Sequence, residues 1–174
     1  QISQCGTYGG SQREIHFVWP GCQDSDLRRT RETSMKIKAV VFDAYGTLFD
    51  VYSVSSTAEQ IFPGQGAQLS VLWRDKQIEY TRLRAMAGRY KPFWDITIDA
   101  LQYSCEALKL DLTDERQRTL LNVYSSLAAY PENRAVLQEL KDRGIKTAIL
   151  SNGNSEMLNI AVRSANFHNL LDAV

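Results

Sequence analysis

Two short polar segments, each directly after an apolar run, hold the residues of this chain best suited to chemistry. Asp43 follows the run Ile37–Phe42, and Ser151-Asn152 follows the run Ile145–Leu150. A carboxylate in such a place can act as a nucleophile, a general base or a metal ligand. Asp43 could equally do no more than cap the turn around Gly46-Thr47, as aspartate often does. Serine and asparagine also occur in loops for reasons of turn geometry alone.

Other familiar catalytic groups are scarce in this chain. The two histidines, His16 and His168, are too few for a histidine-rich metal site and give a Ser-His-Asp triad almost nothing to be built from. The three cysteines, Cys5, Cys22 and Cys105, are odd in number, and none are spaced as C-x-x-C. This pattern disfavours a disulfide scaffold or a zinc ribbon and favours free thiols in a reducing compartment, the cytoplasm.

The segments that must position these polar residues alternate between strand and helix. The two apolar runs are typical of buried strands, and their strand–crossover–strand order favours a parallel sheet. If the strands are neighbours, Asp43 and Ser151-Asn152 face one crevice, because ligands of open parallel sheets bind beyond the carboxyl ends of the strands. Apolar residues at helical spacing predict helices over residues 67–88 and 93–109, and residues 155–166 also read as helical.

Two more helices are predicted from the signals at their ends. Thr113 is expected to cap a helix whose first turn is acidic, which suits the positive end of the helix dipole. Pro131 is expected to open the other helix and Gly144 to stop it. The buried face of this last helix is expected to consist of three apolar residues, Val136, Leu137 and Leu140.

Composition and charge exclude several classes of protein. The chain has 174 residues, with 20 Lys and Arg balancing 20 Asp and Glu. This balance argues against a nucleic-acid-binding protein, which needs clustered excess base, and no apolar run reaches the roughly 18 residues of a membrane-spanning helix. Residues 1–34 show no apolar period, and patterned sequence begins after Met35. We therefore expect residues 1–34 to be an unstructured extension that is not native, and Met35 to be the natural start; the alternative is a genuine flexible extension.

The segments around the polar residues resemble a known family. The first motif of the haloacid dehalogenase (HAD) superfamily is similar to Asp43-Ala44-Tyr45-Gly46-Thr47-Leu48-Phe49-Asp50, and its second motif is similar to Leu150-Ser151-Asn152-Gly153. The cap helix of the type II family, the (S)-2-haloacid dehalogenases, resembles residues Leu72–Thr81 together with Pro63-Gly64. The resemblance extends from Met35 to Val174.

The resemblance implies an α/β fold with a Rossmann-like parallel-sheet core and a helical cap inserted after the first strand. On this interpretation residues 35–49 and 130–174 form part of the HAD core, and residues 50–129 form the cap. No metal or other cofactor is implied. The implied partner is a small 2-haloacid substrate, with neither nucleic acid nor membrane, and the family suggests a homodimer formed through the cap.

The chain departs from the family at its end. It stops at Val174, where the family would be entering its third strand, so the motifs that supply a lysine and a further carboxylate are missing. Lys146 and Asp172 lie outside those motifs and do not replace them. We therefore expect a C-terminally truncated homologue with an incomplete core, an exposed apolar sheet edge and little turnover.

The activity that the resemblance implies is the hydrolytic dehalogenation of (S)-2-haloalkanoic acids to (R)-2-hydroxyalkanoic acids. Asp43 would attack the halogen-bearing carbon, and water would then open the resulting ester. Aspartate, with a reference pKa of about 3.9, is ionised at neutral pH and needs no activating base. Phosphatases of the superfamily carry a second aspartate where this chain has Tyr45, and a departing halide needs no such acid. An Mg²⁺-dependent phosphatase of the superfamily and an inactive fragment are the alternatives.

The catalytic residues are carried over from the motifs that they match. Asp43 is the implied nucleophile, and Thr47 would orient it by a hydrogen bond. Arg74 and Asn152 match the cradle of the leaving group and so also contact the substrate. Arg74 could instead be an ordinary surface arginine of a helix.

The implied substrate-binding residues come from the same segments. Ser151 and the backbone amides of Ala44 and Tyr45 match the groups that bind the substrate carboxylate. The Tyr45 side chain would line the substrate pocket, and Phe93 falls where the family places an apolar wall. Phe93 could instead be plain core of the cap.

Overall fold

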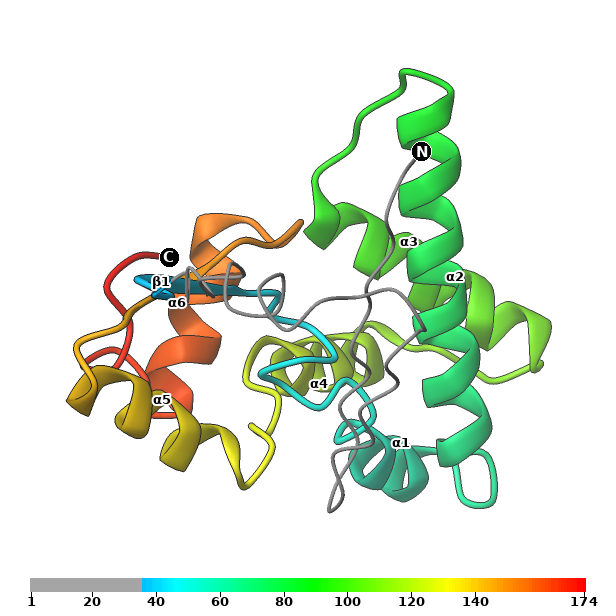
Figure 1. Ribbon diagram of the computed structural model, residues 1–174. Helices are drawn as coiled ribbons and strands as arrows, with labels where there is room; N and C mark the ends of the chain where they lie inside the picture. Colours follow the sequence, from blue (N-terminus) through cyan, green and yellow to red (C-terminus); the bar gives the residue numbers. More distant parts are fainter. Residues whose placement is uncertain (1–35) are drawn as a thin grey trace, which may run out of the picture. The chain divides into compact units, whose positions relative to one another are not determined.

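The computed structural model describes residues 36–174, within which Ile37–Val174 form one unit. The expectations for residues 1–34 and for Met35 concern residues outside this range. None of the helices in residues 36–174 is long and apolar enough to cross a membrane. The elements, in chain order, are β1 (Ala39–Phe42), α1 (Ser55–Ile61), α2 (Gly66–Met86), α3 (Phe93–Ala107), α4 (Asp114–Ser125), α5 (Asn133–Asp142), β2 (Lys146–Ile149) and α6 (Ser155–Ser164) (Figure 1).

The two strands pair side by side in parallel, as the sequence predicts. Their register runs from Ala39 opposite Lys146 to Phe42 opposite Ile149. The pairing continues past the strand ends, where Leu150 N donates to Phe42 O at 2.9 Å. The loops that follow β1 and β2 therefore leave the sheet at the same edge, which is the arrangement that places Asp43 near the second polar segment.

The prediction that β1 is a buried strand is wrong. Val41 exposes 59% of its surface, and Leu150 beyond the end of β2 exposes 76%. The cause is that, in the part of the chain that the structure describes, β1 packs closely on β2 alone, so its side chains lack both a covering helix and a second neighbouring strand. An apolar edge of the sheet is thus exposed.

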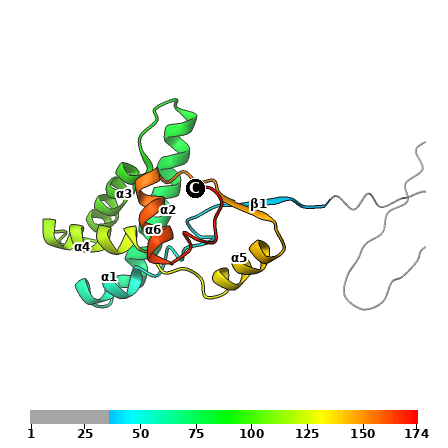
Figure 2. The same ribbon diagram turned by 90° about the vertical axis from the view of Figure 1, so that its left-hand side faces the viewer.

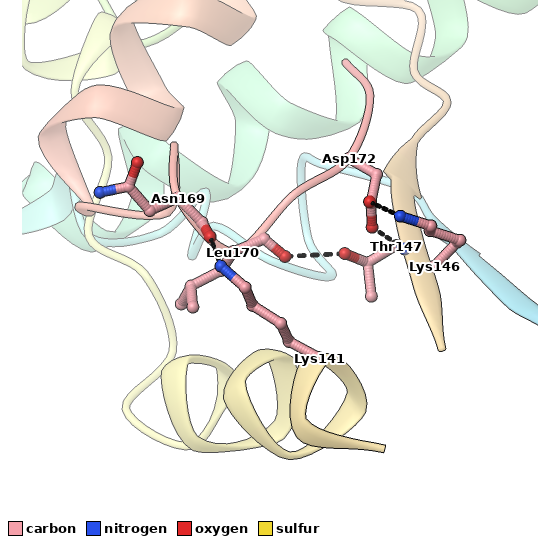
Figure 3. A network of polar contacts seen from close by, with 6 residues as sticks. All are labelled: Lys141, Lys146, Thr147, Asn169, Leu170 and Asp172. Atoms are coloured by element: carbon pink, nitrogen blue, oxygen red, sulfur yellow. Dashed lines mark hydrogen bonds and ion pairs between the residues drawn. The ribbon is translucent and has the colours of Figure 1, made fainter. Parts of the chain in front are cut away.

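The other side of β2 is occupied by the last residues of the chain (Figure 3). Ala173 forms a parallel bridge with Ala148, and the Asp172 carboxylate accepts hydrogen bonds from Lys146 Nζ at 2.6 Å and from Thr147 N at 2.9 Å. These two donors hold the pKa of Asp172 below its ordinary value. Lys146 begins β2, at the end opposite Ser151, so Lys146 and Asp172 pair with each other away from the polar loops.

The predicted helices are confirmed with small shifts at their ends. The ranges 67–88, 93–109 and 155–166 correspond to α2, α3 and α6, and Thr113 caps α4 by accepting a hydrogen bond from Arg116 N at 3.3 Å. The short α1 has no counterpart among the predictions, because its seven residues span too few turns to show an apolar period. Helices α2 and α3 pack side by side (Figure 2).

The buried face predicted for α5 is partly wrong. Leu137 is fully buried and Leu140 is half-buried, but Val136 exposes 43% of its surface. The helix contacts β2 at the edge of the small sheet, and one narrow stripe is enough to cover it. The helix begins at Asn133, after Pro131, and ends before Gly144, whose φ of 68° suits glycine in a C-terminal stop.

The start of α2 is fixed by contacts with α1. The Glu59 carboxylate accepts hydrogen bonds from the backbone N–H groups of Gly64 and of Gly66, the first residue of the helix. A Cβ on Gly66 would lie 2.4 Å from Glu59 N, so the two helices approach as closely as only glycine permits. These contacts settle where α2 starts and therefore where Arg74, two turns further along, is placed.

Candidate active site

The loop after β1 folds back tightly on itself. Leu48 N and Phe49 N donate to Ala44 O at 2.9 and 3.0 Å, and Gly46 adopts a φ of 97° that disfavours other residues. The turn buries Ala44 and Tyr45 while leaving Asp43 exposed at the end of the strand. Asp43 therefore stands on a rigid loop with its carboxylate accessible to a small molecule.

The loop after β2 packs against this first loop. A Cβ on Gly153 would lie 2.7 Å from Tyr45 Cε2, so the Tyr45 ring fills the space that a side chain at position 153 would need. Ser151 Oγ accepts a hydrogen bond from Gly153 N at 3.2 Å, and Asn154 caps α6 by accepting one from Met157 N at 2.9 Å. The two polar segments predicted to share a crevice are thus in contact through Tyr45 and Gly153.

Arg74 reaches the same place from α2. Its Nη2 donates to Tyr45 O at 2.8 Å, and its Nη1 donates to Gln77 Oε1 at 2.8 Å. The side chain is half-buried, and a Cβ on Gly46 would lie 3.6 Å from Nη2. Arg74 is therefore not a solvated surface arginine, because it spans from α2 to the loop that carries Asp43.

A buried polar network supports Arg74, and sequence reasoning missed it. Gln77 is fully buried; its Oε1 also accepts from the Tyr124 hydroxyl at 2.9 Å, and its Nε2 donates to Thr97 Oγ1 at 2.6 Å. Burial raises the pKa of Tyr124, and the neighbouring Arg74 and Gln77 offset part of this rise. One signal could have found Gln77, since it continues the buried stripe of Leu69 and Trp73 at a spacing of four residues.

Aromatic rings form one wall of the site. The Tyr45 ring centroid lies 5.7 Å from that of Phe93 and 6.2 Å from that of Tyr124. Burial, with smaller contributions from Tyr124 and Asp43, raises the pKa of Tyr45, so its hydroxyl stays protonated. The hydroxyl is also buried and, among the described residues, has no hydrogen-bond partner. It is therefore a donor available to a bound molecule.

Two of the residues named from the sequence show fewer contacts. Thr47 and Asn152 are both exposed. Within residues 36–174 no hydrogen bond joins the Thr47 hydroxyl to Asp43, so the orienting role of Thr47 stays a prediction. The same region holds no group of three or more His, Cys, Asp and Glu side chains that could bind a metal ion.

Comparison with known proteins gives a consistent result. Residues 37–174 match the family model described as haloacid dehalogenase-like hydrolase. The chain is 46% identical over 136 residues to the (S)-2-haloacid dehalogenase of Pseudomonas sp. strain YL, which covers 78% of this chain and 59% of the relative. It is 45% identical over 138 residues to the (S)-2-haloacid dehalogenase of Xanthobacter autotrophicus, covering 79% of this chain and 54% of the relative. The chain thus spans little more than half the length of these relatives.

Solved structures show the same similarity. A crystal structure of an L-2-haloacid dehalogenase matches with a TM-score of 0.77 and 58% identity, covering 79% of this chain and 63% of the other. The L-2-haloacid dehalogenase from Xanthobacter autotrophicus with chloropropionic acid covalently bound matches with a TM-score of 0.74 and 44% identity, covering 79% and 56%.

Proposed function

The chain belongs to the haloacid dehalogenase-like hydrolases, and from this premise we propose that it carries out the hydrolytic dehalogenation of (S)-2-haloalkanoic acids, with Asp43 as the nucleophile. The observation that supports the proposal most is the hydrogen bond from Arg74 Nη2 to Tyr45 O at 2.8 Å, which brings a cation to the loop of Asp43. The relatives named (S)-2-haloacid dehalogenase and the relative with covalently bound chloropropionic acid support the reaction class.

The substrate carboxylate would bind between the two polar loops. In the described residues the backbone N–H groups of Ala44 and Tyr45 donate to no other backbone group, so both are available to an anion. Ser151 Oγ stands on the neighbouring loop and can donate a further hydrogen bond. The apolar part of the substrate would lie against the rings of Tyr45 and Phe93.

In the first step a carboxylate oxygen of Asp43 attacks the carbon that carries the halogen. A C–O bond forms, the carbon–halogen bond breaks, and halide leaves with the bonding electrons, which inverts the configuration at that carbon. Arg74 and Asn152 receive the developing charge. A unit charge about 4 Å from a guanidinium gains on the order of 4 kcal/mol at an effective dielectric constant near 20, enough to favour both binding and departure of the halide.

In the second step water attacks the carbonyl carbon of the ester. The bond between that carbon and the ester oxygen breaks, one proton of the water passes to the departing alkoxide oxygen and the other to solvent, Asp43 is regenerated as a carboxylate, and the (R)-2-hydroxyalkanoate is released. Tyr45 stands where the superfamily phosphatases carry their general acid, and neither step needs a proton delivered to the leaving halide. The site chemistry therefore favours dehalogenation over phosphate ester hydrolysis.

We further infer that residues 50–129 form a cap and that residues 35–49 with 130–174 form part of the core. The packing of α1 on α2, of α2 on α3 and of α1 on α4 supports this division.

We also propose a homodimer formed through the cap, supported by the exposed side chains of Leu83 and Met86 near the end of α2. We propose a cytoplasmic location because Cys105, the one cysteine among residues 36–174, carries a free thiol, as is usual in a reducing compartment.

The test is halide release from (S)-2-chloropropionate by the protein extended to the length of its relatives, with the (R) enantiomer as the reference. We expect chloride and (R)-lactate from the (S) substrate only, and no detectable release after Asp43→Asn, which keeps the shape of the side chain but removes its nucleophilicity. The matched control is Asp142→Asn, an exposed aspartate at the end of α5. Equal activity in the Asp43 and Asp142 variants would refute the assignment of the nucleophile.

A further inference from the structure

Gln77 lies one turn beyond Arg74 on α2 and connects it to the interior. Arg74 has only donors, so the Gln77 atom that faces it at 2.8 Å is the amide oxygen. The same oxygen accepts from Tyr124, and the amide nitrogen donates to Thr97 Oγ1. Thr97 in turn donates to Phe93 O at 2.8 Å, which leaves its oxygen free to accept. Each polar atom of the Gln77 side chain therefore has a defined partner.

We propose that Gln77 is a positioning residue that fixes the direction of the Arg74 guanidinium toward the loop of Asp43. This rests on the proposed function, in which Arg74 receives the halide. A free arginine side chain samples many rotamers. Two hydrogen bonds, from Nη2 to Tyr45 O and from Nη1 to Gln77 Oε1, fix the plane of the rigid guanidinium. The remaining N–H groups of Arg74 are then presented to an anion in one orientation.

The absence of charge on the Gln77 amide matters as much as the length of its side chain. A glutamate at this position would hold Arg74 at least as firmly, but its charge would offset the positive charge that a halide needs. Glutamine supplies the acceptor and leaves the net charge of Arg74 intact. The buried position of Gln77 sharpens the effect, because bulk water does not screen the pair.

The direct test follows the Arg74 side chain by NMR in the 174-residue chain. The guanidinium N–H signals are assigned by their loss in Arg74→Lys. We expect separate, slowly averaging Nη signals in the unsubstituted chain and averaged signals in Gln77→Met, which keeps the length of the side chain but removes the acceptor. Gln77→Glu restores an acceptor and should restore the separate signals.

The matched control is Ser70→Ala, one turn before Arg74 on the same helix. It removes the buried hydrogen bond from Ser70 Oγ to Gly66 O at 2.8 Å and leaves both hydrogen bonds of Arg74 with their partners. We expect it to keep the separate Arg74 signals. The proposal is overturned if Gln77→Met keeps them, or if Ser70→Ala loses them as fully as Gln77→Met does. If Gln77→Met does not fold, Gln77→Asn, which is too short to reach Arg74, is compared in the same way.

A second measurement uses sodium bromide as the probe at constant ionic strength. Loss of one hydrogen bond to a charged group predicts about tenfold weaker bromide binding in Gln77→Met, against a change within about twofold in Ser70→Ala. Gln77→Glu should also bind bromide more weakly, although its Arg74 signals stay separate. Unchanged affinity in both Gln77 variants would overturn the proposal. If bromide does not bind at all while the Arg74 signals depend on Gln77, the halide site of the proposed function fails and the positioning of Arg74 stands.

Discussion

At the scale of single residues, Tyr45 links most parts of the site. Its carbonyl oxygen accepts a hydrogen bond from Arg74, and its ring contacts Gly153 and Phe93. Its hydroxyl is buried without a hydrogen-bond partner in the described part of the chain. A buried hydroxyl without a partner normally costs stability. We infer that the chain keeps this hydroxyl because a bound substrate supplies the missing acceptor.

Tyr45→Phe tests this inference. We expect the free energy of unfolding to stay the same or to rise by about 1 kcal/mol, because an unpaired polar group is removed from the interior. The KM for (S)-2-chloropropionate should rise. In the control Tyr124→Phe, Gln77 loses a hydrogen-bond donor, and the free energy of unfolding should fall by about 1 kcal/mol. Equal destabilisation of the two variants, measured by urea unfolding, would contradict the inference.

Motif spacing could predict part of the site at this scale. Asp43 and Ser151 were identifiable because each follows an apolar strand, and Arg74 because its flanking helix resembles that of a known family. Gln77 and Thr97 could not be assigned in this way, since a polar residue within an apolar stripe has no partner until the helices are packed. The contact between Gly153 and Tyr45 likewise depends on two loops that lie far apart in the sequence.

At the scale of elements, local signals predicted helices better than they predicted burial. The Thr113 cap was readable because a cap depends on neighbouring residues. The exposure of β1 and of Val136 could not be read from the sequence, because exposure is decided by which elements pack against a residue. An apolar strand has the same composition whether one or two strands flank it, and this explains why Val41 was expected inside the protein.

Asp172 provides the prediction at this scale. Its lowered pKa means that its carboxylate stabilises the fold above its unfolded pKa of about 3.9, and that this stability is lost as the pH falls through the lower pKa of the folded state. We expect Asp172→Asn to lower the free energy of unfolding at pH 7 and to have little effect once both states are protonated. Urea unfolding across this pH range checks the sign. A difference that grows as the pH falls would contradict the assignment of the pair.

At the scale of the whole molecule, the loop after β2 and one long helix converge on Tyr45, in the loop that carries Asp43. Two elements far apart in sequence, β1 and β2, bring the loops to one edge, and α2 carries Arg74 across to them. The strand order predicted that the two loops share one edge, and the family resemblance predicted that Arg74 joins them. The chain spans 59% of the Pseudomonas relative. The activity proposed for the whole protein is therefore tested by measurements of turnover.

Metal dependence is the first of these experiments. A departing halide is stabilised by Arg74 and Asn152 in the proposed reaction and needs no Lewis acid. We expect the rate of chloride release by the protein extended to the length of its relatives to be the same with and without EDTA. Activity that disappears with EDTA and returns with Mg²⁺ would favour the chemistry of the superfamily phosphatases.

The central claim is that Asp43 attacks carbon and does not act as a general base for water. A carboxylate is a weak base for water at neutral pH but a competent nucleophile when held in line with its target. The most direct measurement is one turnover of (S)-2-chloropropionate in ¹⁸O-labelled water with the protein in excess. The account predicts that the new hydroxyl oxygen of the lactate is unlabelled and that the label enters the Asp43 carboxylate. Labelled lactate from that single turnover, with no label on Asp43, would show direct attack by water and contradict the account.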